Sequence, residues 1–158
     1  MMEPSFEKLL VRLADAQVKF VLVGGLAVTL HGYVRFTEDV DILIASDSAN
    51  VQRLLDSLAT YGEGFARELT VSDFSDDEGA IRIVEETEGS QVDIFTRMSG
   101  MKFEDLAKDA ELFTMSGRTI LYASKSGLIR LKDTSIREKD RLDAAALRRL
   151  MEDPKAFD

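Results

Sequence analysis

One short apolar segment limits strongly which folds this chain can adopt. Residues 18–23 are mainly apolar and rich in β-branched side chains, and the run stops at Gly24-Gly25. This pattern is typical of a buried strand. A short helix over residues 26–30 is expected directly after it, with His31-Gly32 as its end. A buried strand that leads straight into a helix indicates a sheet that carries helices on its faces.

The remaining apolar patterns extend this mixture. Helical spacing predicts helices over residues 5–16, 103–109, 124–132 and 136–151, and another that Ser46 or Asp47 would cap and that reaches Leu58. Alternating or short apolar runs predict strands over residues 40–45, 80–85, 91–96, 112–115 and 119–122, with turns at 88–90 and 116–117. Residues 61–79 are expected to be mostly loop, with a short strand near 69–71. With no repeat or linker, the sequence predicts one α/β (α+β) domain over residues 1–158, a mixed β-sheet flanked by helices.

The composition excludes several classes of protein and site. The chain has 158 residues and no cysteine, which rules out disulfides and cysteine-ligated zinc and favours a reducing cytoplasm. The start does not resemble a signal peptide, and residues 20–30, the longest apolar stretch, are too short to span a membrane. The net charge of −9 argues against broad binding of nucleic acid, although basic residues are dense between Arg118 and Arg149.

The Gly24-Gly25 corner is the first candidate for a functional element. Glycine lets the backbone approach a ligand closely, and the start of a helix offers free N–H groups to a phosphate. The alternative is a tight strand-to-helix turn that needs glycine only for steric reasons. For so short a motif, taken alone, the steric interpretation is the commoner one.

Asp39 and Asp41 stand two residues apart on the strand expected over residues 40–45. The period of a strand places both carboxylates on one face and Val40 on the other. Two neighbouring carboxylates repel each other, and a divalent cation such as Mg²⁺ would relieve that repulsion. The alternative is an ordinary solvent face that begins with two acids.

Asp93 favours the metal interpretation. It lies in Gln91-Val92-Asp93-Ile94-Phe95, an otherwise largely apolar strand, where an acid is costly unless it is paired or bound to a metal. If this strand neighbours the one with Asp39 and Asp41, three carboxylates converge. Three carboxylates suit a two-metal site for phosphoryl transfer.

These segments resemble a known superfamily. The stretch 23–27, the block Arg35-x-Thr37-x-Asp39-Val40-Asp41 and the later Val92-Asp93-Ile94 look like nucleotidyltransferases of the DNA polymerase β type. The double glycine, the Arg-x-Thr lead-in and the distal Lys139-Asp140-x-x-Asp143 most resemble the AbiEii-type branch, the toxins of type IV toxin–antitoxin systems and their relatives.

The resemblance implies roles for the matched residues. Gly24 and Gly25 would hold the triphosphate of an NTP substrate. Asp39, Asp41 and Asp93 would bind two Mg²⁺ ions with the substrate present, and Asp93 would help to activate the acceptor hydroxyl as a base. The reaction would be in-line attack on the α-phosphate with loss of pyrophosphate.

Four further residues are candidates for nucleotide binding. Arg35 and Thr37 could contact the triphosphate, or Arg35 could pair with an acid while Thr37 caps a turn. Lys125 and Lys132 are seven residues apart and would share one helical face. The interpretation that needs no ligand is a solvated basic face.

Lys139 and Asp140 complete the candidate set, again through the family pattern. Lys139 and Asp143 are four residues apart, so a weak surface ion pair between them is the simpler interpretation. The family pattern favours Lys139 and Asp140 as part of the nucleotide site.

Two classes of function follow. The first is a magnesium-dependent nucleotidyltransferase that moves an NMP from an NTP to a hydroxyl of tRNA or another RNA, a protein or a small molecule, possibly as a toxin with an antitoxin protein as partner. The second is a module of the same fold that binds nucleotides without turnover or acts as an antitoxin or partner subunit.

Overall fold

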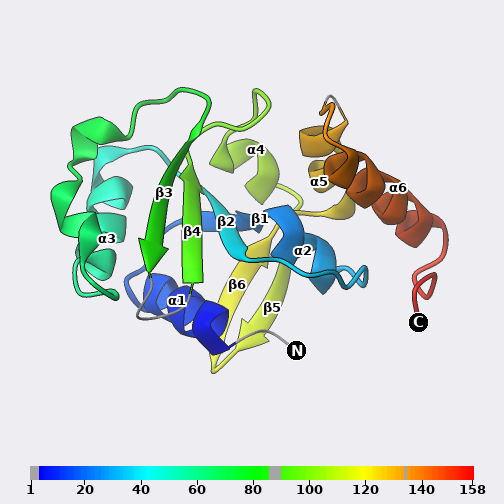
Figure 1. Cartoon of the computed structure of the whole chain (residues 1–158), viewed down its shortest axis with the longest axis horizontal. Helices are drawn as coiled ribbons and strands as arrows, with labels where there is room; N and C mark the ends of the chain where they lie inside the picture. Colours follow the sequence, from blue (N-terminus) through cyan, green and yellow to red (C-terminus); the bar gives the residue numbers. More distant parts are fainter. Residues whose placement is uncertain (1–3, 86–89, 134) are drawn as a thin grey trace.

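A computed structural model describes residues 4–85, 90–133 and 135–158 of the chain (Figure 1). The strands are β1 (Phe20–Val23), β2 (Asp39–Ile44), β3 (Ala80–Glu85), β4 (Ser90–Phe95), β5 (Glu111–Met115) and β6 (Arg118–Tyr122). The helices are α1 (Pro4–Asp15), α2 (Gly24–Leu30), α3 (Ser48–Leu58), α4 (Phe103–Ala107), α5 (Lys125–Lys132) and α6 (Glu138–Glu152). Two short 3-10 helices, η1 (Phe65–Glu68) and η2 (Val71–Asp73), follow α3.

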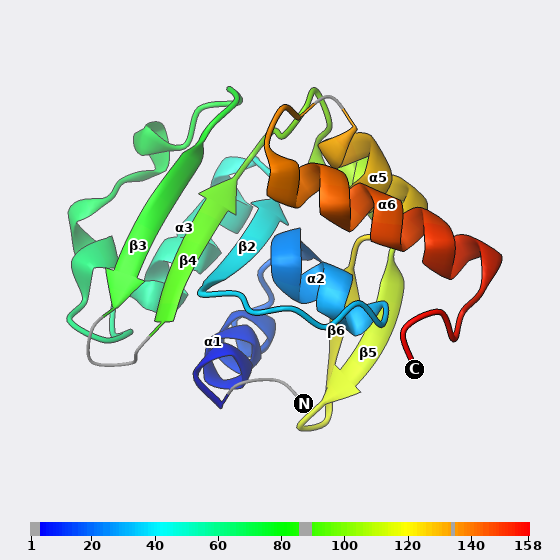
Figure 2. The ribbon, with the colours of Figure 1, turned by 45° about the vertical axis from the view of Figure 1, so that its right-hand side comes forward.

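The six strands form one mixed sheet in the order β3-β4-β2-β1-β6-β5. β2 pairs in parallel with β4, and β1 pairs in parallel with β6, whereas the other neighbours are antiparallel. Figure 2 shows α2, α5 and α6 on the near side of the sheet and α3 behind it. The prediction of an α/β domain with a mixed sheet flanked by helices is confirmed.

The apolar patterns seen in the sequence correspond to the buried core. β1 is buried along its whole length, as expected for the run that ends at Gly24. On β2, Val40 and Ile42 are fully buried while Asp39 and Asp41 are partly exposed, so the two faces separate as the period of a strand requires. No helix in the described part of the chain has the length and apolar character needed to cross a membrane.

The strand predicted near residues 69–71 is wrong. Leu69 and Thr70 lie between η1 and η2, Val71 begins η2, and a capping interaction explains why. The backbone N–H of Thr70 donates to Oδ2 of Asp73 at 2.8 Å, and the side chain of Thr70 caps the same turn. This local polar pairing favours a helical turn over extended backbone. The antiparallel pairing of β3 with β4 is confirmed, but the turn predicted at 88–90 falls largely outside the described residues.

Candidate active site

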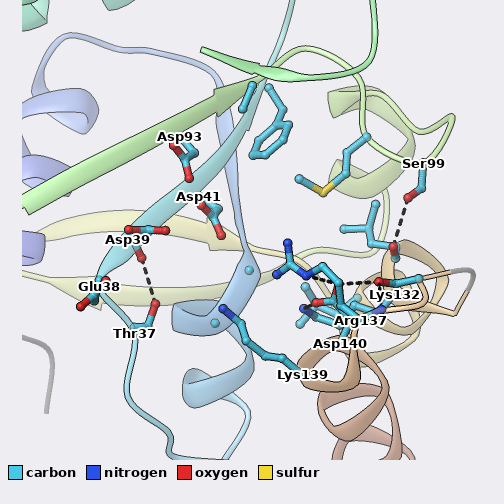
Figure 3. A pocket seen from close by; sticks show the side chains of 18 of the residues that line it. Thr37, Glu38, Asp39, Asp41, Asp93, Ser99, Lys132, Arg137, Lys139 and Asp140 are labelled. Atoms are coloured by element: carbon cyan, nitrogen blue, oxygen red, sulfur yellow. Dashed lines mark hydrogen bonds and ion pairs between the residues drawn. The ribbon is translucent and has the colours of Figure 1, made fainter. Parts of the chain in front are cut away.

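The three aspartates selected from the sequence meet on one face of the sheet. The parallel register of β2 and β4 places Asp41 directly opposite Asp93. Ligand oxygens of Asp39, Asp41 and Asp93 all lie within 4.8 Å of one another. Figure 3 shows the three carboxylates side by side at one wall of a cavity. The predicted convergence is therefore present, and it depends on the strand neighbourhood that the sequence alone left open.

Burial and mutual repulsion perturb this cluster. Burial, followed by the negative charges of Asp93 and Asp39, raises the pKa of Asp41 to about 7. The pKa of Asp39 is also raised, mainly by burial and then by Asp93. Carboxylates whose pKa values rise together favour either a shared proton or a bound cation. Near neutral pH, the cluster is therefore poised to exchange a proton for a metal ion.

Arg82 on β3 is a member of the site that sequence reasoning missed. It stands opposite Asp93 in the antiparallel register of β3 and β4. Its Nε donates to Oδ1 of Asp93 at 2.8 Å, and its Nη2 donates to Oδ2 at 3.1 Å. The same Nη2 lies 3.9 Å from Oδ2 of Asp39. The predicted hairpin placed Arg82 on the strand beside that of Asp93, but the pairing of these two residues follows from the register that the structure shows.

The two glycines make room for neighbouring side chains. Gly24 has a φ of +73°, and a Cβ atom there would lie 2.0 Å from Oδ2 of Asp41. A Cβ atom on Gly25 would lie 2.7 Å from Nη2 of Arg35. These contacts support the steric interpretation of the motif. Both glycines also line the cavity, so their role in holding a phosphate stays a prediction.

A buried charge network supports the opposite wall. Arg35 donates to both carboxylate oxygens of Asp143 at 2.8 Å, and Nζ of Lys132 lies 3.1 Å from Asp143 and from Asp140. The side chain of Asp143 is only 1% exposed. The alternative of a weak surface pair between Asp143 and Lys139 is therefore wrong, because Asp143 is buried and pairs with Arg35. Arg35 pairs with an acid, as its structural interpretation proposed.

Thr37 and the distal lysines differ in their relation to the cavity. The hydroxyl of Thr37 donates to the backbone carbonyl of Asp39 at 3.2 Å. Lys139 makes no ion pair with the residues that the structure describes, and Figure 3 shows it reaching from α6 into the cavity. Lys132 is buried, whereas Lys125 is not among the residues that line the cavity. We therefore leave Lys125 out of the candidate site.

The cavity itself has a volume of about 790 Å³, which is large enough for a nucleotide. The three aspartates and Arg82 line one side, and Lys139 and Asp140 line another. Apolar side chains border the remainder: Phe36, Phe95, Met98, Leu128 and Leu131. Anionic ligands for a metal and cationic groups for phosphates thus face the same space.

Comparisons with solved structures agree with the fold of this chain. A structure of an antigenic nucleotidyltransferase-like protein from Paracoccidioides brasiliensis matches with a TM-score of 0.53 at 18% identity, over 91% of this chain and 73% of that one. A nucleotidyltransferase candidate from Thermotoga maritima matches with a TM-score of 0.54 at 17% identity, over 96% of both chains. At such identities these matches show the shared fold. No curated protein sequence matches significantly.

The family assignment comes from the sequence. Residues 8–115, more than half of the chain, match the family described as the nucleotidyl transferase AbiEii toxin of type IV toxin–antitoxin systems. The matched segment includes β1, the Gly24-Gly25 corner and all three aspartates of the cluster. The chain belongs to the AbiEii family of nucleotidyl transferases.

Proposed function

We propose that the protein is a magnesium-dependent enzyme that transfers a nucleoside monophosphate from an NTP to an acceptor hydroxyl. The observation that carries this proposal is the convergence of Asp39, Asp41 and Asp93 within 4.8 Å at the wall of a nucleotide-sized cavity. Membership of a nucleotidyl transferase family supports the reaction type.

The donor set fits magnesium. All three candidate ligands are carboxylates, and Mg²⁺ prefers hard oxygen ligands from one or two carboxylates completed by substrate phosphates and water. Burial, followed by the neighbouring carboxylates, raises the pKa values of Asp39 and Asp41, and a cation would offset both the lost hydration and the repulsion. When bound, Mg²⁺ supplies positive charge to the phosphate oxygens at which negative charge develops.

The protein's own residues would position the substrate. Lys139, free of ion pairs with the described residues, would contact the triphosphate across the cavity from the aspartates. Gly24 and Gly25 would let the triphosphate approach the backbone, and Arg35 and Thr37 would hold the loop beside it. Positioning of this kind can supply a large part of the rate of phosphoryl transfer.

The chemical step is a single exchange of bonds. The acceptor oxygen forms a bond to the α-phosphorus while the bond to the α–β bridging oxygen breaks, and pyrophosphate leaves with that electron pair. Asp93 would accept the proton of the hydroxyl, because its carboxylate borders the cavity beside the other two aspartates. General base catalysis of this kind contributes about 10²–10⁴-fold in rate.

The finer assignments follow the family. We propose that the chain is the toxin of a type IV toxin–antitoxin system, with an antitoxin protein as its partner, because the family is described in those terms. The acceptor is proposed to be tRNA or another RNA, a protein or a small molecule. We place the enzyme in the reducing cytoplasm, where NTPs and Mg²⁺ are present, and the lack of cysteine in the sequence supports this location.

Transfer of label from α-labelled NTPs tests the reaction. The protein is incubated with each NTP and Mg²⁺, together with cell RNA, cell protein or a set of small hydroxyl compounds. We expect label on one acceptor class, and a loss of about 10²–10⁴-fold in Asp93→Asn. Asp77→Ala, which removes an exposed acid outside the cavity, is the matched control and should keep full activity.

Binding is measured in parallel by thermal unfolding. Mg²⁺ with an NTP should raise the melting temperature of the wild type but not of Asp39→Ala/Asp41→Ala. The same shift in both proteins would refute the metal assignment. A shift in the wild type without transfer under any nucleotide would indicate a module that binds nucleotides without turnover.

Toxicity has its own test. Induced expression of the wild type in a bacterial host should arrest growth, and Asp41→Asn should not, at equal protein levels. Growth arrest by both proteins would separate toxicity from catalysis and contradict the toxin proposal as stated.

A further inference from the structure

Arg82 is hydrogen-bonded to the carboxylate of Asp93, which the proposed metal site needs as its third ligand. Both oxygens of Asp93 accept a hydrogen bond from the guanidinium of Arg82, at 2.8 Å and 3.1 Å. The same guanidinium stands 3.9 Å from an oxygen of Asp39. A divalent ion that binds Asp93 must therefore take one of these oxygens from Arg82, or meet its positive charge at close range.

The remaining two carboxylates have no such cation at hydrogen-bond distance. Oδ1 of Asp39 accepts a neutral hydrogen bond from Nε2 of Gln91 at 2.7 Å. Asp41 forms no ion pair with a described residue; it shares a hydrogen bond with Asp93, and one of its oxygens lies within 4.8 Å of an oxygen of Asp39 and of Asp93. The cluster thus offers two carboxylates directly to a cation and a third that is already paired.

The ion pair between Arg82 and Asp93 can break at little cost. Arg82 lies on β3, an edge strand of the sheet, and its side chain is 57% exposed, while that of Asp93 is 7% exposed. An exposed arginine can move its head group into water at little cost. The Arg35–Asp143 pair differs, since its two side chains are 16% and 1% exposed. The charged partner that can leave the cluster is Arg82.

We propose that Arg82 is a resident cation that competes with divalent metal for Asp93, so that an ion first enters through Asp39 and Asp41 and the full site forms only when the guanidinium moves away. This inference rests on the proposed metal-dependent function. Its consequence is that both oxygens of Asp93 stay hydrogen-bonded to Arg82 until the metal and the substrate are in place. Arg82 is a positioning residue in this scheme, because it acts through Asp93.

Manganese binding, followed by electron paramagnetic resonance of free Mn²⁺, tests the competition without relying on turnover. Arg82→Gln should bind Mn²⁺ about three- to tenfold more tightly than the wild type, which corresponds to about 0.7–1.4 kcal/mol. Arg82→Lys keeps the charge but cannot occupy both oxygens of Asp93, so its affinity should lie between the two. The Mg²⁺ concentration for half-maximal label transfer should be highest in the wild type, intermediate in Arg82→Lys and lowest in Arg82→Gln.

Arg97→Gln is the matched control. Arg97 pairs with Asp76, outside the cavity, at 3.2 Å, so the substitution removes an equal charge without touching the cluster. Its Mn²⁺ affinity should stay within twofold of the wild type. Thermal unfolding in the absence of metal confirms that each variant is folded before its affinity is compared.

The outcomes separate this inference from the function it rests on. Equal Mn²⁺ affinity in the wild type and Arg82→Gln would overturn the competition and leave the metal site intact. Weaker binding in Arg82→Gln would also overturn it and would show that Arg82 orients Asp93 as a ligand. No Mn²⁺ binding in any of these proteins, or binding that survives Asp39→Ala/Asp41→Ala, would refute the proposed metal site itself.

Discussion

Removal of Asp143 should destabilise the protein more than removal of any exposed acid. The side chain of Asp143 is 1% exposed and accepts two hydrogen bonds from Arg35 at 2.8 Å. Lys132, 9% exposed, lies 3.1 Å from the same carboxylate. Asp143→Ala would leave a guanidinium and an ammonium group, both largely buried, without their shared anion. Removal of one partner from a buried ion pair costs about 3–5 kcal/mol.

The expected loss is slightly smaller because both cations keep another partner. Lys132 still contacts Asp140 at 3.1 Å, and Nη1 of Arg35 still donates to the carbonyl of Phe36 at 3.2 Å. We therefore expect Asp143→Ala to lower the free energy of unfolding by about 2–4 kcal/mol. For a chain of this size, that corresponds to a fall of roughly 4–16 °C in melting temperature.

Urea denaturation of the wild type, Asp143→Ala and Asp77→Ala measures this loss directly. Asp77→Ala removes an exposed side chain and should change the free energy of unfolding by less than about 0.5 kcal/mol. The variants Arg35→Ala and Arg35→Ala/Asp143→Ala complete a double-mutant cycle, in which the double variant should lose at least about 1 kcal/mol less than the sum of the single variants. A loss below 1 kcal/mol for Asp143→Ala, or strictly additive effects, would refute a network role for this carboxylate.

Three further predictions concern the cavity itself. Gly24→Ala should abolish Mn²⁺ binding, since the added Cβ would lie 2.0 Å from Oδ2 of Asp41 at a backbone φ of +73°; unchanged binding would contradict that packing. In EDTA, the protein should lose stability as the pH rises from about 4 through 7, because burial and the neighbouring charges raise the pKa of Asp41 from 3.8 to about 7 and the folded state then holds a proton that the unfolded chain has released. Melting curves between pH 5 and 8 check the sign, and Asp41→Asn should remove most of the slope. Lys139→Ala should raise the KM for NTP about tenfold with an unchanged melting temperature, as steady-state kinetics would show, because Lys139 is exposed and makes no ion pair with the described residues.

The carboxylate cluster could be predicted because its determinants are local. Asp39 and Asp41 share a face through the period of β2 alone, and Asp93 stood out as an acid among apolar neighbours. The convergence of the two strands required one further fact, that β2 and β4 are parallel neighbours, and the sequence alone left that pairing open. The strand predicted near residues 69–71 failed because the hydrogen bonds between Thr70 and Asp73 outweigh a weak apolar pattern.

Arg82 and the partner of Asp143 were missed because both pairings are set by tertiary structure. The pairing of Arg82 with Asp93 depends on the register of the β3–β4 hairpin, where a shift of one residue would turn Arg82 to the other face. Arg35 and Asp143 are separated by 108 residues, and their contact requires α6 to pack against the loop before β2. Asp143 has the same helical spacing from Lys139 as an ordinary surface pair, so the sequence alone favours the wrong partner.

Arg35 shows why a structural and a functional interpretation of one residue need not exclude each other. Its guanidinium is fixed by Asp143 and lies where a side chain on Gly25 would otherwise stand, so it shapes the glycine corner from the cavity side. The same ion pair ties the loop before β2 to α6, the helix that carries Lys139. The distance between the aspartate cluster on the sheet and Lys139 on α6 therefore depends on the Arg35–Asp143 pair, although that pair contacts neither the cluster nor Lys139. A change in Arg35 should alter nucleotide affinity through this geometry even if Arg35 never contacts a phosphate.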